Sequence, residues 1–89
     1  MNIEMELDNS VREYFRRNNN RPMPHGLFSN ETKVNVYQAA IKSGMDHAWV
    51  QEKMYETVKL WERKGLCLIH DELTGDIEFT TKGYTYFTS

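Results

Sequence analysis

Apolar residues recur at steps of three and four over the first 18 residues, as they do along one face of a helix. The positions concerned are Ile3, Leu7, Val11, Tyr14 and Phe15. This spacing predicts a helix from about Ile3 to Asn18, although the run Asp8-Asn9-Ser10 favours caps and would also allow a start at Asp8. The next stretch, NNNRPMPHG, contains two prolines, a glycine and three asparagines, so an irregular loop is expected there.

A second helix is predicted after this loop, within SNETKVNVYQAAIKSG. Ser29 or Asn30 can cap its start, and Ser43-Gly44 can end it. Its apolar stripe is expected to consist of Val34, Tyr37, Ala40 and Ile41.

A third helix is predicted after a very short turn, with Asp46 as its cap and Gly65 at its end. Its expected apolar face is formed by Val50, Met54, Val58 and Trp61. Two helices joined by a tight turn that contains glycine are a helix-turn-helix unit by their spacing. The aromatic residues at these periodic positions, and Phe79 further on, are expected in the core: Tyr14, Phe15, Tyr37, Trp61 and Phe79.

A β-hairpin is predicted next, because two short apolar runs flank ELTGD, which supplies the glycine of a hairpin loop. Leu66, Leu68 and Ile69 belong to the first run, and Ile77 and Phe79 to the second. The last residues, TKGYTYFTS, are compatible with a short helix capped by Thr80 or with a third strand.

This order of elements resembles the winged helix-turn-helix superfamily of small MarR-like and PadR-like regulators. The segment VKLWERKGLCL is similar to the end of the family's third helix, and IEFTTKG to its second wing strand running into Thr-x-x-Gly, here Thr80 to Gly83. The likeness covers about Val34 to Phe87. It implies an α+β fold, a winged helix-turn-helix with three helices followed by a two-stranded β-hairpin wing and a short C-terminal element.

Within that fold, one domain over residues 1–89 is expected. The resemblance divides it into an N-terminal helix at 1–20, a helix-turn-helix at 30–65, a wing at 66–80 and a C-terminal element at 81–89. It also implies a homodimer formed through the N-terminal helix, as such regulators often are.

The resemblance further implies that the third helix lies in the DNA major groove and reads base edges with its N-terminal half. The candidate side chains on this sequence are His47, Gln51, Lys53 and Tyr55. Gln51 is suited to adenine, and Lys53 to guanine or phosphate. The alternative is that these residues are only the solvated face of a helix.

The most basic stretch, Arg16, Arg17 and Arg21, is a candidate phosphate contact, or simply an exposed helix end where cations are favoured. The leading hypothesis from sequence is therefore a transcriptional regulator that binds double-stranded DNA.

The charge of the wing points to another function. Four acidic residues and no Lys or Arg lie between Leu66 and Phe79, namely Asp71, Glu72, Asp76 and Glu78. Carboxylates repel phosphates and release no counterions from DNA. The alternative hypothesis is a protein-interaction module whose acidic wing binds a basic partner, such as a polymerase or another nucleic-acid-binding protein. Trp49 is the candidate aromatic anchor of that surface if it is exposed, whereas a core position is the favoured expectation for a tryptophan in so small a domain.

Composition narrows these choices only slightly. The chain has 89 residues, a net charge of −2 and one cysteine, Cys67, which cannot form an internal disulfide, so a reducing cytoplasm is expected. The acidic N-terminal stretch MNIEMELDNS is not expected to be a signal peptide, and no apolar run approaches membrane-spanning length. Cys67 and His70 are too few ligands for a structural zinc, and no nucleophile or phosphate-loop motif appears. We therefore expect no enzyme activity, no metal and no cofactor.

Overall fold

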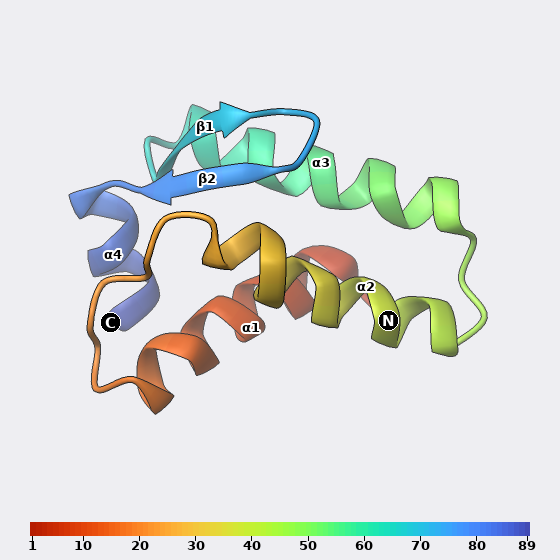
Figure 1. Ribbon diagram of the computed structural model, residues 1–89, viewed down its shortest axis with the longest axis horizontal. Helices are drawn as coiled ribbons and strands as arrows, with labels where there is room; N and C mark the ends of the chain where they lie inside the picture. The colour runs from red at the N-terminus through yellow and green to blue at the C-terminus, as the bar shows by residue number, and fades with distance from the viewer.

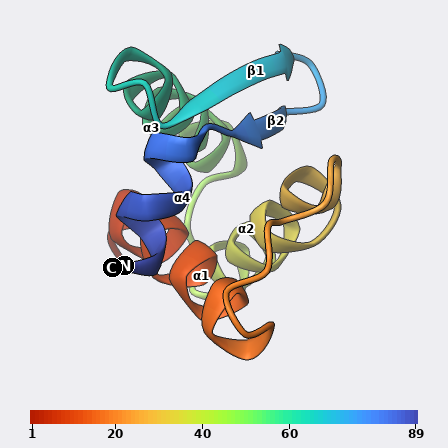
Figure 2. The ribbon, with the colours of Figure 1, turned by 90° about the vertical axis from the view of Figure 1, so that its left-hand side faces the viewer.

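The computed structural model describes all 89 residues as four α-helices, a π-helical turn and a two-stranded antiparallel hairpin, which is an α+β fold (Figure 1). In chain order the elements are α1 (Ile3–Arg17), η1 (Phe28–Thr32), α2 (Lys33–Lys42), α3 (His47–Arg63), β1 (Cys67–Asp71), β2 (Asp76–Phe79) and α4 (Thr81–Thr88). Helix α3 runs along one side with the hairpin beside its C-terminal half, α1 and α2 lie on the other side, and α4 closes one end. The turned view shows the tip of the hairpin projecting away from α1 and α4 (Figure 2).

Helix α1 begins at Ile3, so the alternative start at Asp8 is wrong. Asn2 has an extended backbone, and its side chain accepts a hydrogen bond from the Met5 amide at 3.0 Å, which caps the helix. Asp8 lies inside the helix and pairs with Arg12 at 2.6 Å. The predicted stripe is largely confirmed, because Ile3, Leu7, Val11 and Phe15 are buried and Tyr14 is partly buried beside them.

The start of α2 differs from the prediction. The chain is already helical before Ser29, and the Ser29 hydroxyl donates to the Gly26 carbonyl at 3.1 Å, so neither Ser29 nor Asn30 caps α2. The π-helical turn places Phe28 in the core. The buried residues of α2 are Val36 and Ala40, while Tyr37 and Ile41 pack at the edge of the core and Val34 is exposed. The predicted burial of Ala40 is therefore confirmed, whereas Val36, four residues before it on the same helix face, is buried in place of Val34.

The third helix agrees with its prediction. Asp46 accepts a hydrogen bond from the Trp49 amide at 2.9 Å and caps α3. Gly44 and Gly65 follow α2 and α3 with φ of +86° and +76°, the left-handed conformation that glycine adopts freely. All four predicted core positions of α3 are buried: Val50, Met54, Val58 and Trp61.

The hairpin and α4 are locked together by Thr80. Strands β1 and β2 pair antiparallel, with Cys67 opposite Phe79 and Ile69 opposite Ile77. The Thr80 hydroxyl accepts a hydrogen bond from the Gly83 amide at 3.0 Å and donates to the Gly65 carbonyl at 2.6 Å. The C-terminal segment is therefore a helix capped by Thr80, and the third strand is excluded.

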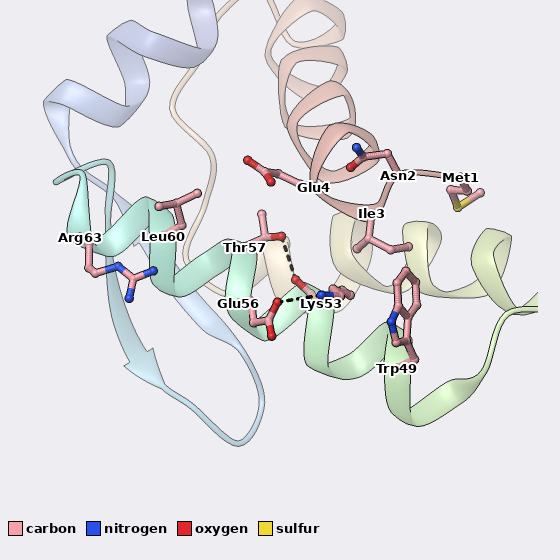
Figure 3. Close-up of a pocket in the computed structure, with 10 residues that line it drawn as sticks. All are labelled: Met1, Asn2, Ile3, Glu4, Trp49, Lys53, Glu56, Thr57, Leu60 and Arg63. Atoms are coloured by element: carbon pink, nitrogen blue, oxygen red, sulfur yellow. Dashed lines mark hydrogen bonds and ion pairs between the residues drawn. The ribbon is translucent and has the colours of Figure 1, made fainter.

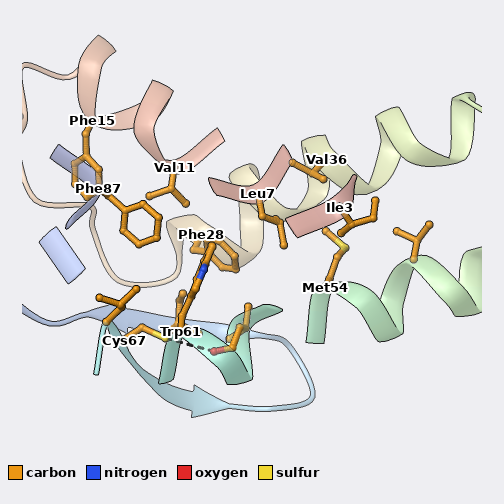
Figure 4. Close-up of a cluster of buried hydrophobic side chains, with 14 of the residues drawn as sticks. Ile3, Leu7, Val11, Phe15, Phe28, Val36, Met54, Trp61, Cys67 and Phe87 are labelled. Atoms are coloured by element: carbon orange, nitrogen blue, oxygen red, sulfur yellow. Dashed lines mark hydrogen bonds between the residues drawn. The ribbon is translucent and has the colours of Figure 1, made fainter. Parts of the chain in front are cut away.

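An aromatic cluster fills the core between the helices and the hairpin (Figure 4). The ring of Trp61 lies 5.0 Å from Phe87 and 5.9 Å from Phe28, in edge-to-face geometry. Phe15 and Phe79 extend the cluster toward α1 and β2. The rings come from five different elements, so this cluster holds the hairpin against the helices.

Candidate interaction surface on helix α3 and the hairpin

The exposed surface of α3 borders two hollows. One, of about 610 Å³, lies between α3 and the N-terminal residues of α1. The other, of about 330 Å³, lies between α3 and the hairpin. Hereafter they are called the α1-side hollow and the hairpin-side hollow.

The candidate DNA-reading residues are divided between the two sides of α3. Gln51 and Tyr55 line the hairpin-side hollow, whereas Lys53 lines the α1-side hollow. The reason is geometric, because a step of two residues turns an α-helix by about 200°. His47 is exposed and hydrogen-bonds the hydroxyl of Tyr37 on α2. Of the four candidates, Lys53 therefore lies on the other side of α3 from Gln51 and Tyr55.

The lysines of α3 are paired with carboxylates. Lys53 Nζ lies 3.3 Å from Glu56. Lys59 Nζ lies 3.4 Å from Glu62 and 3.3 Å from Glu72 of the hairpin, and these hydrogen bonds raise the pKa of Lys59. The charges of these two lysines are thus offset locally before any partner arrives.

The predicted phosphate-contacting arginines lie at the C-terminal end of α1 and in the loop after it, away from α3. Arg16 and Arg17 both reach Glu13, at 2.7 Å and 3.8 Å. Arg16 borders a small hollow against the C-terminal residues Phe87 to Ser89. Arg21 is exposed and makes no ion pair. The structure does not bring these arginines and the α3 candidates onto one surface.

The four hairpin carboxylates have different roles. Asp71 accepts the amide of Leu73 at 2.9 Å and that of Thr74 at 3.4 Å, so it shapes the turn. Glu72 pairs with Lys59. Asp71 and Glu72 are both exposed at the tip, so the end of the hairpin presents negative charge to solvent.

The other two carboxylates are paired with histidines. His25 lies 3.1 Å from Asp76, and His70 lies 3.0 Å from Glu78. The two imidazole rings are in edge-on contact, with centroids 5.0 Å apart. Asp76 is mostly buried, and its second oxygen has no hydrogen-bond partner. This contact between the loop and the hairpin has no signal in the sequence, because His25 and His70 are far apart along the chain.

Trp49 lies on the α1 side of α3, so it does not share a surface with the hairpin carboxylates (Figure 3). Its side chain is 42% exposed, its indole points toward Ile3, and Lys53 Nζ lies 5.6 Å from the ring centroid. The combined surface of Trp49 and the acidic wing expected from sequence is therefore wrong in its geometry.

Two leucines of the hairpin are exposed and were not singled out as site residues from sequence. Leu73, at the tip, is 96% exposed and lines the hairpin-side hollow, and Leu68 is 53% exposed outside it. Lys33 of α2 reaches the same hollow and donates to the Thr74 carbonyl at 3.2 Å. Burial lowers the pKa of Lys33. This surface could have been predicted from the sequence, because Leu73 is an apolar residue that lies among acidic residues in a predicted turn.

Some kinds of chemistry receive no support from the arrangement. The chain has no group of three or more His, Cys, Asp or Glu side chains placed to hold a metal ion. Cys67 is buried, and burial, with a smaller effect of Glu62, raises the pKa of its thiol to about 12, so the thiolate that a nucleophile requires is not formed near neutral pH. None of the helices is both long enough and apolar enough to span a membrane.

Comparison with known proteins found no family model that matches this chain, and no curated protein or solved structure that matches it significantly.

Proposed function

We propose that this chain is a winged-helix protein-interaction module that binds a basic partner protein through its hairpin and α3. The order of the elements supports the winged-helix part of the proposal, because α2 and α3 are joined by a tight turn and an antiparallel hairpin follows directly. In this reading the hairpin is the wing.

One observation carries the choice of a protein over DNA. The only charged side chains that the hairpin presents, apart from His70, are carboxylates, and the lysine that reaches it from α3, Lys59, is already held between Glu62 and Glu72. A phosphate approaching the wing would meet carboxylates and no Lys or Arg of the hairpin, and no counterions would be released from DNA. A protein surface rich in Lys or Arg is instead attracted to these carboxylates, because complementary electrostatic potentials speed association.

The experiment compares wild-type protein with Glu72→Lys/Glu78→Lys. These two carboxylates are exposed, whereas Asp71 holds the turn and Asp76 is mostly buried, so changing the latter pair would also disturb the fold. Glu4→Lys/Glu31→Lys is the matched control, because it changes the net charge equally at exposed positions outside the hairpin.

Two measurements are made on the three proteins. Photocrosslinking in nuclease-treated lysate should identify a basic protein with wild type and with the control, and lose it with Glu72→Lys/Glu78→Lys. Retardation of random and genomic DNA duplexes at low salt, where electrostatic attraction is strongest, should be absent with wild type. The proposal is refuted if wild-type protein retards DNA and if crosslinking is the same for wild type and Glu72→Lys/Glu78→Lys.

DNA binding is the second candidate, favoured by one arrangement. His47, Gln51 and Tyr55 are exposed on the N-terminal half of α3 and point to one side of it, as residues that read a major groove do. If duplexes are retarded and Gln51→Ala relaxes sequence preference while Arg21→Ala weakens binding to all sequences alike, a DNA-binding regulator is the better description.

A homodimer through α1 stays a prediction. The apolar stripe of α1 is buried in the core of its own protomer, so Met1 and Met5 are the large apolar side chains that this segment leaves exposed.

A further inference from the structure

We infer that the hairpin-side hollow is the specificity pocket of this surface and that it receives one large apolar side chain, flanked by Lys or Arg, from a segment of the basic partner. This inference rests on the proposed protein-binding function, and it adds the place and the chemistry of the contact.

The hollow has an apolar floor and an apolar rim. Met54 and Val58 of α3 form the floor with Ile69 of β1. Tyr55 from α3 and Leu73 from the hairpin tip line it with exposed side chains, 45% and 96% exposed. Because Leu73 is almost fully exposed, covering it and Tyr55 with another apolar side chain removes apolar surface from water on both partners.

The charge around the hollow selects a basic segment. Glu52 on the α3 side makes no ion pair, and Glu72 on the hairpin side is shared with only one lysine, Lys59. The cation that lines the hollow, Lys33, is half-buried and turned to the Thr74 carbonyl, where burial lowers its pKa. Cations that flank the inserted side chain therefore meet a free carboxylate at Glu52 and, at Glu72, a carboxylate that only Lys59 shares.

The size of the hollow limits the occupant. Its volume of about 330 Å³ lies at the small end of the range of about 300–1,000 Å³ that is usual for ligand pockets. It admits a side chain of the size of leucine or phenylalanine rather than a helix laid along it. A short extended segment with a single anchor fits this space and the projecting hairpin tip beside it.

The test uses the full chain and a random nine-residue peptide library displayed on phage. Sequences selected on wild type should share a large apolar residue flanked by Lys or Arg. Synthetic copies, measured by fluorescence anisotropy, should lose about tenfold or more in affinity with Leu73→Ser, the effect expected for an anchor contact of ordinary size. Glu52→Lys should weaken them by a similar factor.

Two matched variants control for general effects. Leu68→Ser removes an exposed leucine from the same hairpin outside the hollow, and Glu4→Lys reverses an exposed charge on the other side of α3. Both should keep affinity within about twofold of wild type, and neither they nor Leu73→Ser should change the far-UV spectrum, because these side chains are exposed.

The outcomes separate the inference from the proposed function. Basic peptides that respond to Glu78→Lys but not to Leu73→Ser overturn the pocket and leave the proposed function standing. A library that yields acidic or neutral sequences, or nothing, overturns both. A concentration-dependent dimer in sedimentation velocity that Leu73→Ser disperses assigns the hollow to a second copy of the chain and overturns the basic partner.

Discussion

Replacement of Gly83 by alanine should destabilise the fold severely, although the residue lies in a helix that alanine favours. A Cβ atom at this position would lie 1.8 Å from the carbonyl oxygen of Leu66 and 2.8 Å from its carbonyl carbon. Real Cβ contacts essentially never fall below 3.0 Å. The clashing atoms belong to the Leu66 backbone at the junction between α3 and β1, so the rotation of a side chain cannot relieve the clash. Helix α4 must therefore shift by more than an ångström.

The size of the effect follows from what α4 would lose. Two hydrogen bonds join Thr80 to the α3–β1 junction, from its amide to Leu66 at 3.0 Å and from its hydroxyl to Gly65 at 2.6 Å. Each contributes about 1 kcal/mol. Phe87, which is 2% exposed, would separate from the ring of Trp61, and losing roughly half of a buried phenylalanine costs about 2 kcal/mol.

The better helix propensity of alanine returns about 1 kcal/mol, so the net loss is about 3 kcal/mol. For a domain of this size, that loss lowers the melting temperature by roughly 12–24 °C. Urea and thermal unfolding followed by far-UV circular dichroism measure both quantities.

Two controls bracket the result. Thr85→Ala lies in the same helix, exposed, and should stay within about 0.5 kcal/mol of wild type. Gly44→Ala meets open space but keeps a φ of +86°, so it should cost about 1 kcal/mol from backbone strain alone. If Gly83→Ala costs no more than Gly44→Ala, α4 does not approach the Leu66 carbonyl as described and the reasoning is refuted.

Three further predictions concern the cap, the thiol and the hairpin tip. Asp46→Ala removes the acceptor of the Trp49 amide and should lower the free energy of unfolding by about 1 kcal/mol in urea titrations, whereas Asp46→Asn should restore most of it. The pKa of Cys67 is raised by burial from 9.0 to about 12, so the unfolded chain loses this proton first and stability should fall between pH 9 and pH 12; Cys67→Ala, compared over the same range, should flatten that fall. Leu73→Ser should leave the melting temperature unchanged within about 2 °C, because its side chain has almost no native contacts to lose; a larger drop would mean that the leucine is packed.

The elements whose signals are local could be predicted from the sequence. Asp46 and Gly65 mark the ends of α3, and the apolar residues between them keep one helical phase, so α3 is found where it was expected. The hairpin could be predicted for the same reason, because the residues that favour its turn lie together in the five-residue segment ELTGD.

The start of α2 could not be predicted in this way. Phe28 enters the core through the π-helical turn, where it packs against Trp61 at 5.9 Å and Phe79 at 6.2 Å. Those partners lie 33 and 51 residues further along the chain. The helical turn at Phe28 is therefore stabilised by tertiary contacts, which produce no periodic pattern in the local sequence. The capping preference of Ser29 is overridden as a result.

The candidate site was predicted least well, for two different reasons. Lys53 and Gln51 lie on different sides of α3 because of helical geometry alone, so this separation could have been predicted from the sequence. The pairing of His25 with Asp76, and the use of Asp71 inside the turn, depend on how the loop folds over the hairpin. Counting four carboxylates in the wing therefore overestimated the negative charge that it offers to a partner.

The two tryptophans give the protein a pair of built-in optical probes. Trp61, 3% exposed among other rings, should emit at short wavelength and resist quenching by iodide until the core opens. Trp49 is 42% exposed on the opposite side of α3 from the hairpin, so iodide should quench it in the native state. Its fluorescence should not change when a ligand binds at the hairpin tip. Unfolding and events on the α1 side can therefore be followed separately in the unlabelled chain, with Trp49→Phe as the variant that isolates the core signal.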